Sequence, residues 1–141
     1  MMDNKGKMMV EAYVKCSNHT QDDRNNDTAQ IACTSEYAES HNMEVEHWYI
    51  DKAKTGLNTK RLEYQRMKQD IENGNVEGKI ILVKTIDRLH RNIKDLLVDA
   101  EWFKKHDVRI IGITDGIDTA ATNGKFAMTI KAATAMEGLE E

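Results

Sequence analysis

Three charged side chains, Asp87, Arg88 and Arg91, follow directly after the unbroken apolar run Ile80-Ile81-Leu82-Val83. A run of branched apolar residues is typical of a strand that is buried on both faces of a parallel sheet. Open α/β sheets bind their ligands just beyond the carboxyl ends of such strands. Because a guanidinium is a planar, permanently charged, bidentate donor, two arginines at this place indicate a phosphate or carboxylate ligand.

A hydroxyl group stands at the equivalent place after a second predicted strand, which covers residues 8–15. Ser17 follows that strand two residues after Lys15, and Arg61 lies at the start of a later predicted helix. If both strands belong to one parallel sheet, their carboxyl ends meet at one edge. The predicted site is then a nucleophile among positive charges. It suits attack on a phosphodiester, whose transition state gains negative charge and needs fixed donors.

The hydrophobic pattern predicts strands that alternate with helices. The strands are expected at residues 8–15, 45–50, 80–83 and 108–113, and the helices at residues 27–41, 62–73, 92–106 and 123–141. This order is typical of an α/β fold with a mostly parallel central sheet of four to five strands and helices on both faces. Residues 51–60 are expected to form a mobile loop, and Asp115-Gly116 a turn.

Three helices have a predicted inner face. The helix at residues 27–41 should turn Ile31, Ala32, Ser35 and Ala38 inward, and the helix at residues 62–73 should carry Tyr64, Met67, Lys68 and Ile71 along one stripe. Apolar residues recur at i, i+3, i+4, i+7 and i+10 over residues 92–106, so this is the clearest amphipathic helix, with Asn92 as its predicted cap.

Composition sets the broad class. With 141 residues, 31% of them charged and 40% hydrophobic, the chain is expected to be one soluble cytoplasmic domain without a membrane segment. The two cysteines form no CxxC pair, and the sequence spacing indicates no metal site. A net charge of −4 argues against a surface that is basic all over, so any contact with nucleic acid has to come from a local cluster of basic residues.

Five short motifs resemble the catalytic domain of the serine recombinases, the group of resolvases, invertases and large serine integrases. They are Y-V-K-C-S at residues 13–17, Gln30, T-G-L-N-T-K-R at residues 55–61, D-R-L-H-R at residues 87–91 and D-G-I-D-T at residues 115–119. The motifs stand in the family's order with compatible spacing, from about Val10 to Ala135. The longer gap from Ser17 to Gln30 is closer in style to the large integrases.

The resemblance implies a function and a set of residues. Ser17 would attack double-stranded DNA and form a 5′-phosphoserine link, without metal or nucleotide cofactor. Arg61, Arg88 and Arg91 would clamp the phosphate, supported by Lys15, and Asp87 would orient them or handle a proton. Gln30 would join Arg61, Arg88 and Arg91 in DNA contact.

The resemblance also implies an assembly. The protein would act as a dimer and, with two duplexes, as a tetramer. Residues 1–141 would be the N-terminal catalytic domain, with a long C-terminal helix cut short and the DNA-binding domain absent.

Departures from the family pattern leave alternatives open. Lys15 stands where arginine is usual, Asn18 where a second Ser or Thr is common, and Gly138-Leu139 where an acidic residue and an arginine are usual. The domain could therefore be a catalytically silent assembly or regulatory module. A phosphate-binding signalling domain fits less well, because it would need acidic residues where Lys15-Cys16-Ser17 stands. Taken singly, Ser17 is compatible with a loop or capping serine, and Asp87 with an ion-pair partner.

Overall fold

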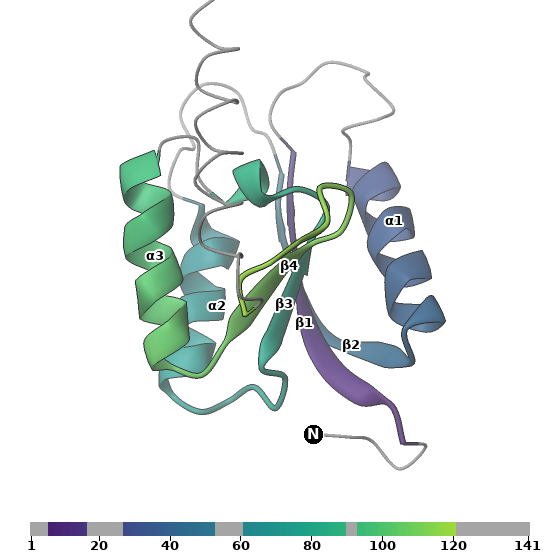
Figure 1. The fold of residues 1–141 in the computed structure, drawn as a ribbon, viewed down its shortest axis with the longest axis horizontal. Coiled ribbons are helices and arrows are strands. Elements are labelled where there is room, and N and C mark those ends of the chain that lie inside the picture. Colours follow the sequence, from purple (N-terminus) through teal and green to yellow (C-terminus); the bar gives the residue numbers. More distant parts are fainter. Residues whose placement is uncertain (1–5, 17–26, 53–60, 90–92, 121–141) are drawn as a thin grey trace, which may run out of the picture.

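The computed structural model describes residues 6–16, 27–52, 61–89 and 93–120. Its sheet has the strand order β2-β1-β3-β4-β5 (Figure 1). The strands are β1 (Met8–Lys15), β2 (Met43–Asp51), β3 (Ile80–Val83), β4 (Arg109–Gly112) and β5 (Ile117–Asp118). The pairs β1–β2, β1–β3 and β3–β4 are parallel, and β5 is antiparallel to β4. The predicted mostly parallel sheet is confirmed.

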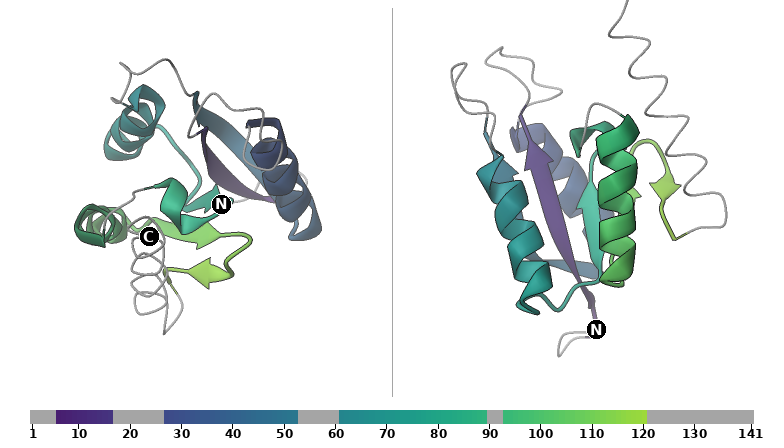
Figure 2. Two further views of the ribbon diagram at one scale, coloured as in Figure 1. Left: turned by 90° about the horizontal axis from the view of Figure 1, so that it is seen from above. Right: turned by 90° about the vertical axis from the view of Figure 1, so that its left-hand side faces the viewer.

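Helices cover both faces of this sheet. One face carries α1 (Asp27–Ser40), and the other carries α2 (Leu62–Glu72) and α3 (Ile93–Lys105), as Figures 1 and 2 show. The described residues form two buried apolar clusters. The one under α2 and α3 includes Tyr13, Tyr49, Tyr64, Met67, Ile81, Leu96 and Phe103. The one under α1 includes Val10, Ala38, Ile80, Leu82 and Ile111. The sheet is therefore the middle of three layers.

The two strands that carry the predicted site lie side by side in the centre of the sheet. All four residues of β3 are buried, as its continuous apolar run predicts. In β1 the five residues from Val10 to Val14 are buried, and one of them is the carboxylic acid Glu11. Since the two strands are parallel neighbours, their carboxyl ends point to the same edge of the sheet.

The inner face of α1 differs from the prediction. Ala32 and Ser35 are exposed, whereas Gln30, Thr34 and Ala38 are buried at positions i, i+4 and i+8. The hydrophobic pattern was misleading because two of the three buried side chains are polar and have hydrogen-bond partners inside the protein. The hydroxyl of Thr34 donates to the carbonyl of Gln30 at 2.8 Å.

Two boundaries also differ from the prediction. Asp51 is the last residue of β2 rather than part of a loop. The turn predicted at Asp115-Gly116 is confirmed, with φ of 66° at Gly116, but the chain after it forms the short strand β5, which the residue pattern did not indicate. Such a positive φ suits glycine because it has no Cβ. Residues 53–60, Asn92 and residues 123–141, which were predicted as loop, cap and helix, lie outside the described residues.

In the part of the chain that the structure describes, no helix has the length and apolar character that a membrane span requires.

Candidate active site

Arg61 links three segments at the carboxyl edge of the sheet. It precedes α2 in the left-handed backbone conformation, with φ of 51° and ψ of 57°. Its Nε donates to the hydroxyl of Tyr13 at 3.3 Å, and its Nη2 donates to the carbonyl of Arg88 at 3.4 Å. Its guanidinium also lies 4.0 Å from the ring centre of Tyr64. A left-handed non-glycine residue costs on the order of 1–2 kcal/mol, so these contacts hold Arg61 in a conformation it would otherwise avoid.

Asp51 organises the groups around Arg61. Its Oδ2 accepts a hydrogen bond from the Tyr13 hydroxyl at 2.7 Å. Its two carboxylate oxygens also accept from the backbone amides of Glu63 and Tyr64, at 2.9 and 3.0 Å. These amides belong to the first turn of α2, where N–H groups have no partner within the helix. Asp51 therefore caps α2 from a neighbouring strand and fixes the residue that precedes the helix.

The Tyr13 hydroxyl stays protonated in this network. Burial raises the pKa of Tyr13, and the neighbouring Arg61 only partly offsets that effect. The phenol can therefore donate to Asp51 while it accepts from Arg61, so one hydroxyl connects the strand end to the arginine.

Gln30 holds the end of β1 from the opposite face. Its side chain is fully buried. Its Nε2 donates to the carbonyl of Lys15 at 2.9 Å, and its Oε1 accepts from the Lys15 amide at 3.3 Å. Both backbone groups of Lys15 are thereby satisfied by one side chain. Gln30 thus fixes the point at which β1 leads to Ser17, while its predicted contact with DNA stays a prediction.

A short 3₁₀ helix, η1 (Ile86–Arg88), carries the next part of the predicted site. The amide of Ile86 donates to Oδ2 of Asp115 at 2.9 Å, and the amide of Arg88 donates to the carbonyl of Thr85 at 3.1 Å. Asp115 therefore anchors the start of η1. The sequence placed Asp115 in a turn but gave no sign that its side chain reaches a segment 29 residues away.

Lys15 is the last residue of β1, and Arg61 contacts the Tyr13 hydroxyl on β1 and the backbone carbonyl of Arg88 on η1, which follows β3. Ser17 and Arg91 lie outside the described residues. Asp87 is in η1, but its side chain is not among the described groups. Tyr13, Asp51 and Asp115 are the residues that sequence reasoning missed as positioning groups.

Arg66, which also lies near the start of α2, has other partners. It pairs with Glu63 at 2.7 Å and with Asp70 at 3.6 Å.

Comparison with known proteins decides the family. The family described as "Resolvase, N terminal domain" matches residues 10–140. This chain belongs to that family. A "Resolvase/recombinase" of Pseudomonas putida is 32% identical over 96 residues, which are 68% of this chain and 50% of that protein. The chain thus spans about half the length of the curated relatives it matches.

Two solved structures have the same fold. The N-terminal catalytic domain of TP901-1 integrase gives a TM-score of 0.73 at 29% identity, covering 94% of this chain and 97% of that one. A resolvase family site-specific recombinase from Streptococcus pneumoniae gives 0.77 at 25% identity, covering 95% and 91%. The predicted family and fold, a serine recombinase catalytic domain, are confirmed.

Proposed function

We propose that this chain is the catalytic domain of a site-specific DNA recombinase that uses Ser17 as its nucleophile. The observation that supports this best is the position of Arg61. Its guanidinium lies between the Tyr13 hydroxyl on β1 and the Arg88 carbonyl on η1, so one cation connects the two segments near the end of β1. Membership of the resolvase N-terminal domain family supports the reaction class.

The reaction is a phosphoryl transfer that conserves bond energy. The Ser17 oxygen attacks the phosphorus, the bond to the 3′ oxygen breaks, and that oxygen takes up a proton to leave as a free 3′-hydroxyl. In the reverse reaction another 3′-hydroxyl attacks the 5′-phosphoserine ester. This step joins the two DNA ends and releases the Ser17 hydroxyl. Arg61, Arg88 and Arg91 stabilise the negative charge that develops on the phosphate oxygens, and Lys15 adds one more cation. Asp87 orients these cations or handles the proton.

The partners follow from this chemistry. The substrate is double-stranded DNA, and exchange between two duplexes requires a homo-oligomer, a dimer on each site and a tetramer when two sites meet. Residues 1–141 act as one catalytic domain in this proposal. Gln30 contributes to DNA contact through the strand end that it holds. Recognition of a base sequence is then the task of a separate domain, because phosphate contacts alone carry no sequence information.

The direct test is detection of the covalent intermediate. The chain is incubated with a nicked duplex, and the products are separated on a denaturing gel that resolves protein-linked DNA. We expect an adduct with the natural chain and none with Ser17→Ala. Ser35→Ala, which changes an exposed serine on α1, is the matched control and should form as much adduct as the natural chain.

Two results would contradict the proposal. An adduct that persists in Ser17→Ala would move the nucleophile to another residue, and Cys16→Ser would then test the neighbouring thiol. A properly folded natural chain that forms no adduct at any protein concentration would instead support the catalytically silent module.

A further inference from the structure

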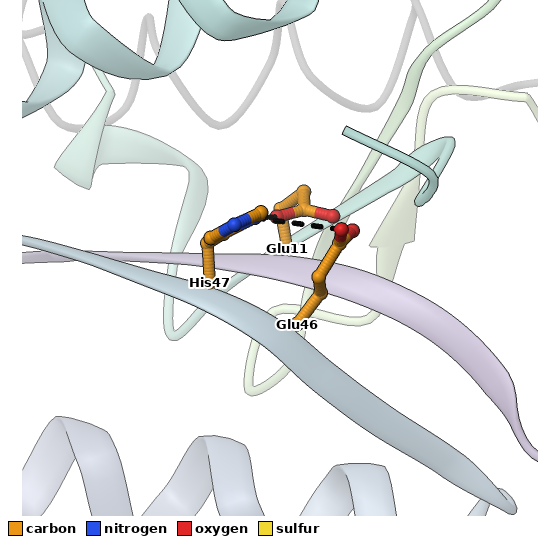
Figure 3. Close-up of side chains that lie close together, drawn as sticks. All are labelled: Glu11, Glu46 and His47. Carbon is orange, nitrogen blue, oxygen red and sulfur yellow. Dashed lines mark hydrogen bonds and ion pairs between the residues drawn. The ribbon is translucent and has the colours of Figure 1, made fainter. Parts of the chain in front are cut away.

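A second group of chemically active side chains lies away from the proposed active site. Glu11 comes from β1, and Glu46 and His47 come from β2 (Figure 3). Their oxygen and nitrogen donor atoms all lie within 4.8 Å of one another. Glu11 precedes Lys15 by four residues, which is roughly 13 Å along a strand. The group is therefore separate from the residues proposed to act on DNA.

A bulge in the pairing of β1 with β2 brings these residues together. Val10 pairs with Val45, but Glu11 pairs with His47, so Glu46 is an extra residue on β2. A bulge of this kind re-aims side chains, and here two consecutive residues of β2 both approach Glu11. Along a regular strand, consecutive side chains point to opposite faces.

The hydrogen bonds of the group leave one oxygen of each carboxylate directed at His47. The amide of Gly78 donates to Oε2 of Glu11 at 3.3 Å, and the amide of Glu77 donates to Oε2 of Glu46 at 3.0 Å. The two Oε1 atoms face the Nδ1 of His47, at 2.8 Å for Glu11 and 3.8 Å for Glu46. Backbone amides that hold the second oxygen are the outer-shell support that ligating carboxylates usually have.

The backbone at Gly78 makes room for this arrangement. A Cβ at Gly78 would lie 2.7 Å from Oε2 of Glu11 and 2.9 Å from Cα of Val10, closer than carbon atoms can approach. Glycine therefore lets the chain before β3 come close enough for its amide to reach the buried carboxyl. The donor set is thus held by three separate segments of the chain.

We propose that Glu11, Glu46 and His47 form a binding site for a divalent transition-metal ion such as Zn²⁺. Zinc bonds of about 2.0–2.2 Å in a tetrahedral arrangement place neighbouring donor atoms roughly 3.3–3.6 Å apart. The two measured separations from Nδ1 bracket that range. One imidazole and two carboxylates suit zinc, whereas Ca²⁺ and Mg²⁺ prefer six or more oxygen ligands.

Burial and charge support the same conclusion. The Glu11 side chain is 0% exposed, and the carboxylates of Glu11 and Glu46 are neighbours. Because Glu11 is buried next to Glu46, a negative charge on its carboxylate is costly without a neighbouring cation. A divalent cation would offset the two negative charges together. The side chains of His47 and Glu46 are 38% and 19% exposed, so an ion and a completing water can enter from solvent.

The test is zinc binding by the 141-residue chain after treatment with a chelator and its removal. We expect calorimetry to give one Zn²⁺ per chain, and the melting temperature to rise with Zn²⁺ concentration. Glu46→Gln and His47→Gln should weaken binding at least about tenfold, the scale of effect known for the support of metal ligands. Both side chains lie at the partly exposed rim, so these variants should fold even if Glu11→Gln does not.

His41→Ala is the matched control. His41 is an exposed histidine just after α1, and its loss should leave zinc affinity unchanged. In nuclear magnetic resonance spectra, Zn²⁺ should shift the imidazole signals of His47 and the amide of Gly78. Absence of one-to-one binding would overturn the proposal. Equal affinity in Glu46→Gln, or zinc-dependent shifts confined to other histidines, would overturn it as well.

Discussion

At the scale of single residues, Tyr13 and Tyr49 form a natural comparison. They pair across β1 and β2, both are fully buried, and each hydroxyl donates to a carboxylate, Tyr13 to Asp51 at 2.7 Å and Tyr49 to Asp70 at 2.8 Å. Burial raises the pKa of both phenols. Only the Tyr13 hydroxyl also accepts from Arg61. Comparing the two tyrosines therefore separates the contribution of a buried hydroxyl to stability from the contribution of the Tyr13 hydroxyl to the proposed active site.

We expect Tyr13→Phe and Tyr49→Phe each to lower the free energy of unfolding by about 1 kcal/mol, because each removes a hydrogen bond to a carboxylate, and Tyr13→Phe to lower it further because the bond from Arg61 is lost as well. Only Tyr13→Phe should slow formation of the DNA adduct, by about tenfold, which corresponds to roughly 1.4 kcal/mol in the barrier. Urea unfolding and single-turnover cleavage measure the two effects. Equal rates in the two variants would show that the Tyr13 hydroxyl does not position Arg61.

At the scale of elements, η1 depends on a side chain from the turn after β4. Asp115 accepts from the amide of Ile86, and a Cβ at Gly112 would collide with the Asp115 carboxylate. The turn and the 3₁₀ helix therefore pack as one unit. Arg88 belongs to that unit, so its place depends on the turn.

Asp115→Ala should remove the anchor of η1. We expect a loss of about 1 kcal/mol in the free energy of unfolding, faster hydrogen exchange at the Ile86 amide and slower DNA cleavage. Asp118→Ala is the control, because the Asp118 carboxylate pairs with Arg109 at 3.8 Å and accepts from the Ala120 amide at 2.9 Å, and neither contact involves η1. A partly exposed pair of this kind contributes about 0–1 kcal/mol. Unchanged exchange at Ile86 in Asp115→Ala would show that η1 holds its shape without the carboxylate.

The elements also show where sequence reasoning works and where it fails. The strand β3 was predictable because it is apolar on both faces, and α2 because Tyr64, Met67 and Ile71 follow one helical stripe. The inner face of α1 was not predictable, because Gln30 and Thr34 are polar side chains that find hydrogen-bond partners inside the protein. The bulge that gathers Glu11, Glu46 and His47 depends on pairing between strands, which local pattern does not contain.

The candidate active site also contains some residues that the sequence predicts and others that it does not. Lys15, Arg61 and Arg88 were predictable as a group because strand ends of a parallel sheet converge. The residues that position these cations, such as Asp51, were not predictable. Asp51 was assigned to a loop, yet it caps α2, because a carboxylate at the end of a neighbouring strand reaches the free amides of the helix.

At the scale of the whole molecule, the charge limits how the chain binds DNA. The net charge is −4, so attraction must come from the local cluster that includes Lys15, Arg61 and Arg88. We expect the 141-residue chain to bind duplexes weakly and without regard to sequence, because specific recognition needs contacts with base edges. With three to four phosphates neutralised, the logarithm of the binding constant should fall with the logarithm of salt concentration with a slope of about −3.

Fluorescence anisotropy at several salt concentrations measures this slope. Arg88→Ala should make it shallower by about 1, since one phosphate contact is lost. Glu72→Gln, a change of an exposed residue at the far end of α2, is the control and should leave the slope unaltered. Tight binding to one duplex over its scrambled version, unaffected by raised salt, would contradict the expectation.

The central place of β1 has a consequence for how the protein is made. The ribosome synthesises this strand first, yet it pairs on one side with β2 and on the other with β3, where Glu11 meets Ile81. At roughly 5–20 residues per second, the second partner follows several seconds later. During that interval β1 can pair with β2 alone, so its other edge, along the apolar stretch from Val10 to Val14, is open. An open apolar edge can pair with another chain, so this is the stage of synthesis at which the protein is most exposed to aggregation.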